Sequence, residues 1–394
     1  MKGAYDGLRV LDLSRDVAGA MAAMYFADQG AEVLRLLPPG HTWREQVARD
    51  PGYLCWDRNK LLSTLDRDSA DGQAELRRLL AAADLVILDD RPADLEQAGL
   101  DADTLLAAHP RLVHLWLPLL GPQPPWRDLP ADRLLADAVT TASGEHGSYE
   151  QVPVAVVTPL VSYAQAILGA TAAAAALLER RRSGRGQGVL VTGAHAAVAL
   201  QAASLTDAAG VIRPVQTAGG GAPQFHIYRC SDGKWLYLAA MTQPLFVVAL
   251  DVLDLLDVLA TPGMDGDILN MMKPEVGEPV AARLRARFAE RTRDEWARLF
   301  TAADVPNAPT QSRDEWWASN VVASNGMRAR WAHPDLGTVE LPGNPIRMSR
   351  TPGVLSHLPN AAAHVDSRTM WTDPPAGANA NAGAGAGTDA DTAA

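Results

Sequence analysis

A long segment of small and apolar residues, spanning 158–189, constrains the fold of this chain more than any other stretch. Ser162 and Gln165 stand in the S-x-x-Q spacing of a capping box, which predicts that a helix begins at Ser162. Three consecutive arginines then precede Gly184, and both features are typical of a helix C-terminus. Alanines dominate the middle of the segment, so another backbone can approach it closely. We therefore predict a buried central helix rather than a membrane span, since polar side chains interrupt the apolar run.

The N-terminal part of the chain alternates between strand and helix signals. Residues 8–13 and 31–36 are short apolar runs typical of strands, and residues 20–29 between them form an Ala- and Met-rich helical segment closed by Gly30. The alternation continues toward residue 120 and predicts a doubly wound, Rossmann-like α/β sheet. The first turn lacks the complete G-x-G-x-x-G fingerprint, so a dinucleotide site is not predicted there.

Composition narrows the functional classes. The 394 residues are 47% hydrophobic and 21% charged, which is typical of a soluble globular protein of two domains. The net charge of −11, without long basic runs, argues against nucleic acid as a partner, and no membrane partner is expected. Cys55 and Cys230 lie far apart without a CxxC motif, so neither a disulfide framework nor a metal site is predicted. The N-terminus MKGAYDGLRV has no apolar signal core, which predicts a cytoplasmic protein.

Glycine-rich and low-complexity stretches divide the chain. We predict a large α/β domain over residues 1–216, a Gly-rich linker at 217–224, a smaller α/β domain at 225–318, a return to the large domain at 319–372 and a disordered tail at 373–394. Within the small domain, residues 231–233 predict a hairpin turn. Pro279 suits the first position of a helix, and Thr292 suits the cap of the next one.

Several motifs resemble the class III CoA-transferases of the CaiB/BaiF type, whose relatives include formyl-CoA transferase and α-methylacyl-CoA racemase. The motifs are G-L-R-V-L-D-L-S and A-D-Q-G-A-E-V-L-R near the N-terminus, A-A-L-L-E-R-R-R-S-G-R-G-Q at the end of the central helix, and Y-R-C-S-D-G-K-W-L-Y-L-A-A in the small domain. The resemblance covers roughly residues 7–355. It implies an interlocked dimer that moves CoA between carboxylic acids, with acyl-CoA as substrate and no permanently bound cofactor.

The resemblance also implies where the reaction occurs. In this family an aspartate at the start of the central helix attacks the thioester, and counting back from Ser183 puts that position on Ser162. A hydroxyl would form a more stable ester and would need a base, so a helix-capping role for Ser162 is favoured over a nucleophilic one. Racemase members use a histidine and an aspartate, which fall on Leu135 and Ser162. Asp137, Glu145 and His146 are the candidate substitutes, although a solvated helix end or loop is the favoured interpretation of each.

Residues near strand ends of the first domain are candidates for CoA binding, because ligands bind at the carboxyl edge of such sheets. Cationic side chains there suit phosphates, although Arg35 also fits a solvated surface and Arg91 a structural turn. The glycine run at 219–221 resembles a mobile loop over the family's site and fits a plain linker equally well. Asp89 and Asp90 would repel a phosphate that faced them. The predicted CoA-binding residues are Arg15, Val17, Ala18, Arg35, Asn59, Lys60, Arg91, Pro92, Gly219, Gly220 and Gly221.

Three functions stay open from the sequence. The chain can be a CoA-transferase with altered chemistry at Ser162, a non-catalytic subunit paired with a paralogue that supplies the aspartate, or an acyl-CoA-binding or regulatory protein. An acyl-CoA racemase or epimerase is a further alternative. The missing aspartate favours the second and third functions, and the partner chain can be identical or paralogous. The retained R-N-K and R-P motifs favour contact with CoA.

Overall fold

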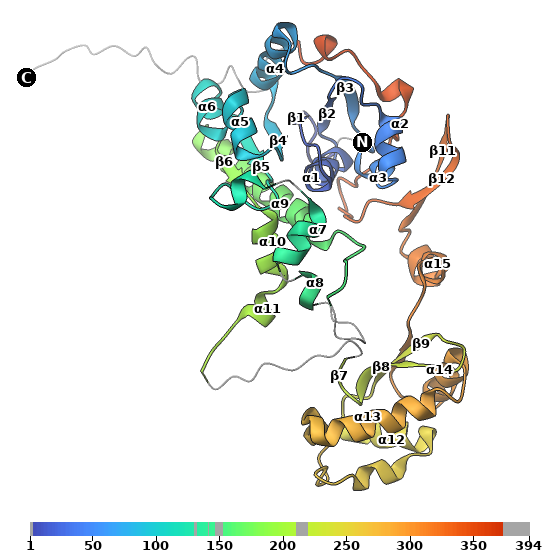
Figure 1. Ribbon diagram of the computed structural model, residues 1–394. Coiled ribbons are helices and arrows are strands. Elements are labelled where there is room, and N and C mark those ends of the chain that lie inside the picture. The colour runs from blue at the N-terminus through green and yellow to red at the C-terminus, as the bar shows by residue number, and fades with distance from the viewer. Residues whose placement is uncertain (1–2, 130–131, 141, 146–152, 210–219, 373–394) are drawn as a thin grey trace, which may run out of the picture. The chain divides into compact units, whose positions relative to one another are not determined.

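The computed structural model describes residues 3–129, 132–140, 142–145, 153–209 and 220–372. The chain forms two compact units, shown in Figure 1. Unit 1 consists of residues 1–142, 156–202 and 323–394, and unit 2 consists of residues 143–155 and 203–322.

Unit 1 is built on a six-stranded parallel sheet with the order β3-β2-β1-β4-β5-β6. The strands are β1 (Arg9–Asp12), β2 (Glu32–Leu37), β3 (Leu61–Thr64), β4 (Leu85–Leu88), β5 (Val113–Trp116) and β6 (Gly188–Leu190). The chain moves outward from β1 to β3, returns to β4 beside β1, and then moves outward on the other side. The prediction of a doubly wound α/β sheet is therefore confirmed, and the strand order reverses between β1 and β4.

Helices pack against both faces of this sheet (Figure 1). Phe26 and Ala173, from two different helices, share one core with Val10, whereas Leu79 packs on the other face with Leu11. Neighbouring residues of β1 point into opposite cores, so both Val10 and Leu11 in the middle of the strand are apolar, as parallel strands between two helical layers require. The helices of unit 1 are α1 (Val17–Asp28), α2 (Trp43–Arg49), α3 (Tyr53–Trp56), α4 (Ala70–Ala82), α5 (Pro92–Ala98), α6 (Ala102–Ala108), α7 (Arg133–Val139), α9 (Leu160–Ser183) and α10 (Gly193–Leu200).

Helix α9 is the predicted central helix. It ends at Gly184, whose φ of 77° is the left-handed conformation that favours glycine, so the predicted stop is confirmed. The prediction that Ser162 caps the helix is wrong, because Pro159 is the cap residue and its carbonyl already accepts the Tyr163 N–H at 2.9 Å. A Cβ atom on Gly169 would lie 2.7 Å from a Leu117 methyl group, so small residues allow α9 to approach β5 and the segment after it closely.

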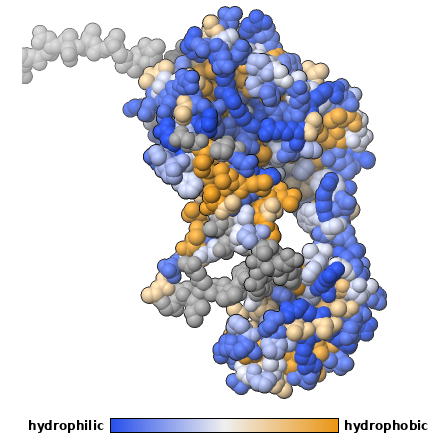
Figure 2. Space-filling view, viewed as in Figure 1, coloured by the Kyte–Doolittle hydropathy of each residue, from blue (hydrophilic) through white to orange (hydrophobic). Residues whose placement is uncertain are grey.

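Helix α9 is also the one helix in the described part of the chain with the length and apolar composition of a membrane span. Its most apolar window has a mean hydropathy of 1.5, and 44% of that window is buried inside the protein. Core helices of soluble proteins have the same properties, and α9 packs against α1, α10 and β5. The remaining face of α9 carries exposed apolar side chains, and Figure 2 shows hydrophobic residues gathered over α9 and α10.

The C-terminal part of the described chain returns to unit 1. The Val365 N–H donates to the Leu62 carbonyl of β3 at 2.8 Å. Asn59 fastens the same returning segment, because its Nδ2 donates to the Val354 carbonyl at 2.8 Å and its Oδ1 accepts from the Ser356 N–H at 2.7 Å. Before this contact the segment forms an antiparallel hairpin of β11 (Arg328–His333) and β12 (Gly337–Pro342).

Unit 2 contains a four-stranded antiparallel sheet with the order β10-β9-β8-β7. Its core joins Tyr228 of the sheet to Phe288, whose rings stack with centroids 4.4 Å apart, and to the fully buried Trp296. The strands are β7 (Gly220–Ala222), β8 (Phe225–Arg229), β9 (Trp235–Ala239) and β10 (Asn307–Pro309), and the longer helices are α12 (Gln243–Leu253), α13 (Pro274–Phe288) and α14 (Arg293–Ala302). A shorter helix of unit 2 is α15 (Arg313–Ala318). Three short helices lie where the chain passes between units: α8 (Ala142–Glu145), α11 (Ala202–Leu205) and α16 (Asn320–Ser324).

Local predictions in unit 2 have mixed outcomes. The hairpin turn at residues 231–233 is confirmed, and so is the cap at Thr292, which forms a capping box with Glu295. Pro279 does not begin a helix: α13 already begins at Pro274, a second proline that suits the first turn equally well. Gly220 and Gly221 lie in strand β7 instead of the expected linker, because this strand pairs with β8 through Gly220 and Ala222. Gly219 lies outside the described residues.

Candidate functional site

The carboxyl ends of β1 and β4 lie side by side where the strand order of unit 1 reverses. The loop after β1 carries Arg15 and Asp16, and the loop after β4 carries Asp89, Asp90 and Arg91. Ligands of doubly wound sheets bind in the crevice at this point. A cavity of about 630 Å³ opens there, which is within the range of small-molecule sites.

Several predicted CoA-binding residues meet at this cavity, which we call the switch-point cavity. Its lining includes Arg15, Val17, Ala18 and Arg91. Pro92 lines a smaller cavity beside it, together with Arg91. The sequence interpretation missed further lining residues, among them Arg49, Tyr53, Arg133 and Gln165 and the acidic Asp16, Asp50, Asp94 and Asp132. Gln165 lies three residues after Ser162 on α9, and that spacing could have identified it.

Asp89 occupies the beginning of α1. Its carboxylate accepts the Arg15 N–H at 2.8 and 2.9 Å and the Asp16 N–H at 2.7 Å. Asp16 in turn accepts the Val17 N–H at 2.7 Å, so three consecutive backbone donors are taken by carboxylates. Burial, together with the nearby charges of Asp90 and Asp16, raises the pKa of Asp89 to about 8. The helix N-terminus, where an anionic ligand would be favoured, thus already holds an internal carboxyl group.

Arginines line the neighbouring surface. A second cavity of about 860 Å³ adjoins the first, since Arg15, Asp90 and Arg91 line both, and it also contains Arg67 and Arg77. Arg15 pairs with Asp90 at 3.3 Å, and Arg67 reaches the other oxygen of the same carboxylate at 3.6 Å. Four guanidinium groups around one groove make it suitable for a polyanionic ligand. Asp90 partly neutralises Arg15 and Arg67, and Asp94, which also lines the groove, pairs with Arg91 at 2.9 Å.

Arg35 and Lys60 lie inside the protein. Both side chains are fully buried, and Lys60 Nζ lies 2.8 Å from Asp12 and 3.1 Å from Asp57. Arg35 pairs with Asp57 at 2.7 Å. Burial alone would raise the pKa of Asp12, but the charges of Lys60 and Arg35 hold it below its usual value. Arg35 and Lys60 therefore have buried carboxylate partners, and Asn59 binds the returning segment. CoA binding by these three residues stays a prediction, since the charged groups of Arg35 and Lys60 are not exposed to a ligand.

The start of α9 has a serine, Ser162, at the position where the resemblance implies the catalytic aspartate. Ser162 is the third residue of the helix, is 2% exposed, and lines neither cavity. Gln165, on the next turn, donates from Nε2 to the Pro118 carbonyl at 3.0 Å and to the Val191 carbonyl at 2.9 Å. Asp137 is buried in α7, and His146 lies outside the described residues. A nucleophilic role for Ser162 and a proton-transfer role for Asp137 or His146 remain predictions.

The remaining candidates lie elsewhere. Gly220 and Gly221 belong to β7 of unit 2, whereas the switch-point cavity belongs to unit 1. In the part of the chain that the structure describes, no three His, Cys, Asp or Glu residues form a group that could hold a metal ion. The groups that converge at the cavity are thus arginines, carboxylates and amides, which can bind and orient a polyanion.

The sequence profile described as CoA-transferase family III matches residues 5–365. The chain belongs to CoA-transferase family III. Its fold agrees with this membership: it matches the crystal structure of Rv3272 from Mycobacterium tuberculosis with a TM-score of 0.77, 24% identity, and coverage of 91% of this chain and 96% of that one. A CaiB/BaiF family protein from Brucella suis matches with a TM-score of 0.78 and 20% identity, covering 91% and 96% of the two chains.

Relatives of this family III chain are named as CoA-transferases. The succinyl-CoA–L-malate CoA-transferase alpha subunit of Chloroflexus aurantiacus is 29% identical over 367 residues, which cover 89% of this chain and 84% of the relative. The beta subunit of the same name is 27% identical over 376 residues, covering 91% and 92%. Mouse succinyl-CoA:glutarate CoA-transferase is 24% identical over 358 residues, covering 88% and 80%. CoA thioesters are therefore the substrate class of the family.

Proposed function

We propose that this family III chain binds an acyl-CoA thioester at the switch-point cavity. We further propose that it is the subunit of a two-chain CoA-transferase that lacks the catalytic carboxylate. The observation that carries the proposal is Ser162, a buried hydroxyl on the first turn of α9, where the family resemblance implies the catalytic aspartate. Residues 160–178 contain no Asp or Glu that could replace it.

The chemistry explains why the carboxylate matters. CoA transfer between acids passes through an anhydride and a thioester of the enzyme carboxylate, and both species remain reactive enough to go backward and forward. An ester formed by Ser162 would be more stable than a thioester and would stop the exchange. A chain with serine at this position therefore suits substrate binding or support of a partner's active site.

The two adjoining cavities suit the parts of CoA. Arg15 and Arg91, which line both, are suited to the diphosphate, and the groove with Arg67 and Arg77 suits further phosphate groups. Gln165 and Arg133 also line the switch-point cavity, and we assign them to the acyl end of the ligand. CoA acts as a substrate that binds and leaves, with no cofactor held permanently.

The apolar face of α9 and α10 supports a partner chain. Its exposed members include Ile167, Leu178, Val198 and Leu200, which are 49%, 62%, 59% and 56% exposed (Figure 2). Contiguous exposed apolar surface of this kind marks protein interfaces. The Chloroflexus relatives are named as alpha and beta subunits, which favours a related but non-identical partner over a second identical copy. Both described cysteines are free, which suits the reducing cytoplasm.

An exchange assay tests this function. The purified chain is titrated with CoA and succinyl-CoA in a calorimeter, and is then assayed for label exchange between succinate and succinyl-CoA, alone and mixed with a family III chain that has the carboxylate. We expect the chain to bind the thioester at micromolar concentration, to be inactive alone, and to raise the exchange rate of its partner. Exchange by the wild-type chain alone would contradict the proposal.

The Ser162→Asp variant is the matched test of chemistry. Ser162 itself lines neither cavity, so the longer aspartate must reach the bound thioester; if it does, this variant gains exchange activity that Ser162→Asn, of the same size, lacks. An acyl-CoA-binding or regulatory protein is the second candidate, favoured by the absence of a carboxylate in the first turns of α9. Such a protein would bind CoA equally well. Its Ser162→Asp variant would gain no exchange activity, and the wild-type chain would not raise the exchange rate of a partner.

A further inference from the structure

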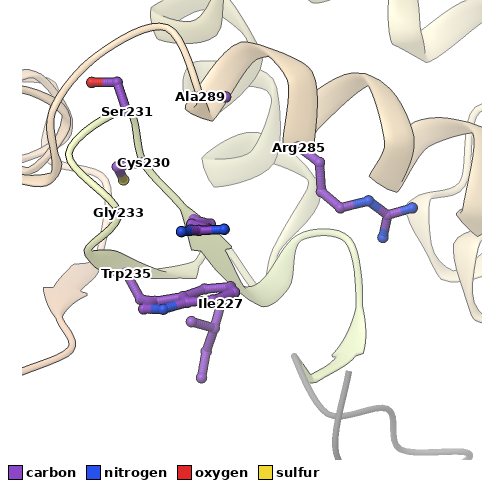
Figure 3. Close-up of a pocket in the computed structure, with 8 residues that line it drawn as sticks. Ile227, Cys230, Ser231, Gly233, Trp235, Arg285 and Ala289 are labelled. Carbon is purple, nitrogen blue, oxygen red and sulfur yellow. The ribbon is translucent and has the colours of Figure 1, made fainter. Parts of the chain in front are cut away.

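Unit 2 has a cavity of its own, far in sequence from the residues of the switch-point cavity. It measures about 460 Å³ and lies at the turn between β8 and β9, beside the last turns of α13. We call it the hairpin cavity. Figure 3 shows Ile227 and Trp235 on the strands and Arg285 on the neighbouring helix. Its size falls within the range of about 300–1,000 Å³ that is typical of small-molecule sites.

Strand geometry explains why an aromatic floor and a cation meet here. Arg229 and Trp235 are directly opposite each other in the antiparallel register, and Ile227 lies two residues earlier on β8. These three side chains share the sheet face opposite Tyr228 and Leu236, which point into the core. The core face is filled, so the opposite face presents an indole and an aliphatic side chain to the cavity.

The charged residues that line the hairpin cavity are both positive, Arg229 and Arg285. None of its lining residues is acidic, in a chain whose net charge is −11. Among the described residues, Arg229 has no carboxylate within ion-pair distance. Arg285 pairs with Glu278, which does not line the cavity and whose side chain is 69% exposed. Burial, with the charge of Asp232, raises the pKa of the Cys230 thiol to about 11, so this thiol adds no negative charge at neutral pH.

We propose that the hairpin cavity binds a small organic anion with a flat apolar body, such as an aromatic carboxylate. The guanidinium groups of Arg229 and Arg285 would receive the carboxylate, and the ring would lie against Trp235 and Ile227. The turn at Cys230 and Ser231 closes one end. No bond is made or broken at this site, so the site is one for binding, and it is independent of the function proposed for unit 1.

The test uses the full-length protein and cinnamate as the probe. Calorimetric titration of the wild type is compared with Arg229→Gln and Arg285→Gln, and with Arg283→Gln as the matched control. Arg283 lies on the same helix and pairs with Asp257 but does not line the cavity. Losing a charged hydrogen-bonding group should weaken binding about tenfold or more in the first two variants and leave it unchanged in the third. Thermal melting of each variant shows whether it is folded.

Each result decides the proposal. Equal cinnamate affinity in the wild type, Arg229→Gln and Arg285→Gln would place the ligand elsewhere and overturn it, as would the absence of binding to the wild type. Inorganic phosphate, which has no apolar body, should bind much more weakly than cinnamate. If phosphate binds equally well, the cavity is a plain anion site and the assigned ligand class is wrong. Trp235→Ala should weaken cinnamate and leave phosphate unaffected.

Discussion

Asp89 accepts the backbone N–H of Arg15 with both oxygens of its carboxylate, at 2.8 and 2.9 Å. The loop after β4 thereby fills the anion-binding end of the first helix with a side chain of the protein itself. A phosphate group that approaches this end meets Asp89, Asp16 and Asp90 together with Arg15. The protonation state of Asp89 should therefore influence ligand affinity.

Asp89→Asn should change the pH dependence of CoA binding. The pKa of Asp89 is raised to about 8, so the group is neutral below that pH and charged above it. Repulsion of the diphosphate should weaken CoA binding by the wild type as the pH rises from about 7 to about 9, and the neutral amide should remove most of this loss. Calorimetry across this range measures it. Asp94→Asn, at the same cavity, should leave the pH dependence in place; an unchanged profile in Asp89→Asn would contradict the prediction.

The same substitution should affect stability. A carboxyl group whose pKa is higher in the folded than in the unfolded chain favours folding only while it is protonated. The contribution is fully present below about pH 4 and is lost as the pH rises toward about 8, where the folded group ionises. Asp89→Asn should therefore unfold at a higher temperature than the wild type at pH 8 and show little difference at pH 4. A Tm difference that is the same at both pH values would argue against the raised pKa.

Lys60→Met should destabilise unit 1. The ammonium group lies 2.8 Å from Asp12 and 3.1 Å from Asp57, and all three side chains are buried. Removing it leaves buried carboxylates short of a counter-charge, which typically costs about 3–5 kcal/mol in the free energy of unfolding. Urea unfolding measures this cost. Arg368→Met, which breaks the exposed pair with Asp366, should change stability far less, because exposed ion pairs contribute little.

Arg77→Gln tests the groove beside the switch-point cavity. Arg77 lines this groove, and its side chain is exposed. If the groove receives phosphate groups of CoA, the variant should bind CoA about threefold to tenfold more weakly, and the difference should shrink at high salt because exposed charges are screened. Arg182→Gln, an exposed arginine outside the groove, is the control. Equal affinity of both variants would place the nucleotide elsewhere.

Substitution of the α9 and α10 face tests the partner chain. Ile167→Glu and Val198→Glu put charges on exposed apolar positions, so they should lower the self-association or partner affinity measured by sedimentation velocity. Both positions are already exposed in the isolated chain, so thermal stability at low protein concentration should change little. Leu336→Glu, at an exposed apolar position in the β11–β12 hairpin, should leave assembly intact.

The doubly wound sheet could be predicted from the sequence because its strands and helices have strong local signals. The stop of α9 at Gly184 is another example, since a left-handed residue after a basic turn is a local feature. The start of α9 could not be fixed in the same way. Ser162 satisfies a capping-box pattern, but the helix begins earlier, with Pro159 as its cap residue, and the serine is buried within the first turn.

The candidate site was less accessible to sequence reasoning. Arg35 and Lys60 are cations near strand ends, as expected of ligand contacts, but their carboxylate partners Asp12 and Asp57 come from other segments. Asp89 is expected from the sequence to repel phosphates, whereas its hydrogen bonds from the Arg15 and Asp16 N–H groups depend on the adjacency of β1 and β4. Such pairings are long-range, and one sequence does not encode them in any local pattern.

The returning segment has a consequence for biosynthesis. Val365 hydrogen-bonds to Leu62, and the carbonyl of Met370 accepts from Arg78 at 2.9 Å, so the last described residues of the chain finish the unit that its first residues begin. Roughly three hundred residues separate these partners. During translation, the segments 1–142 and 156–202 of unit 1 leave the ribosome long before the returning segment can join them, and the main segment of unit 2, residues 203–322, emerges in between. Unit 2 can therefore fold on the ribosome, whereas unit 1 reaches its final form only after Val365 and Met370 have been translated.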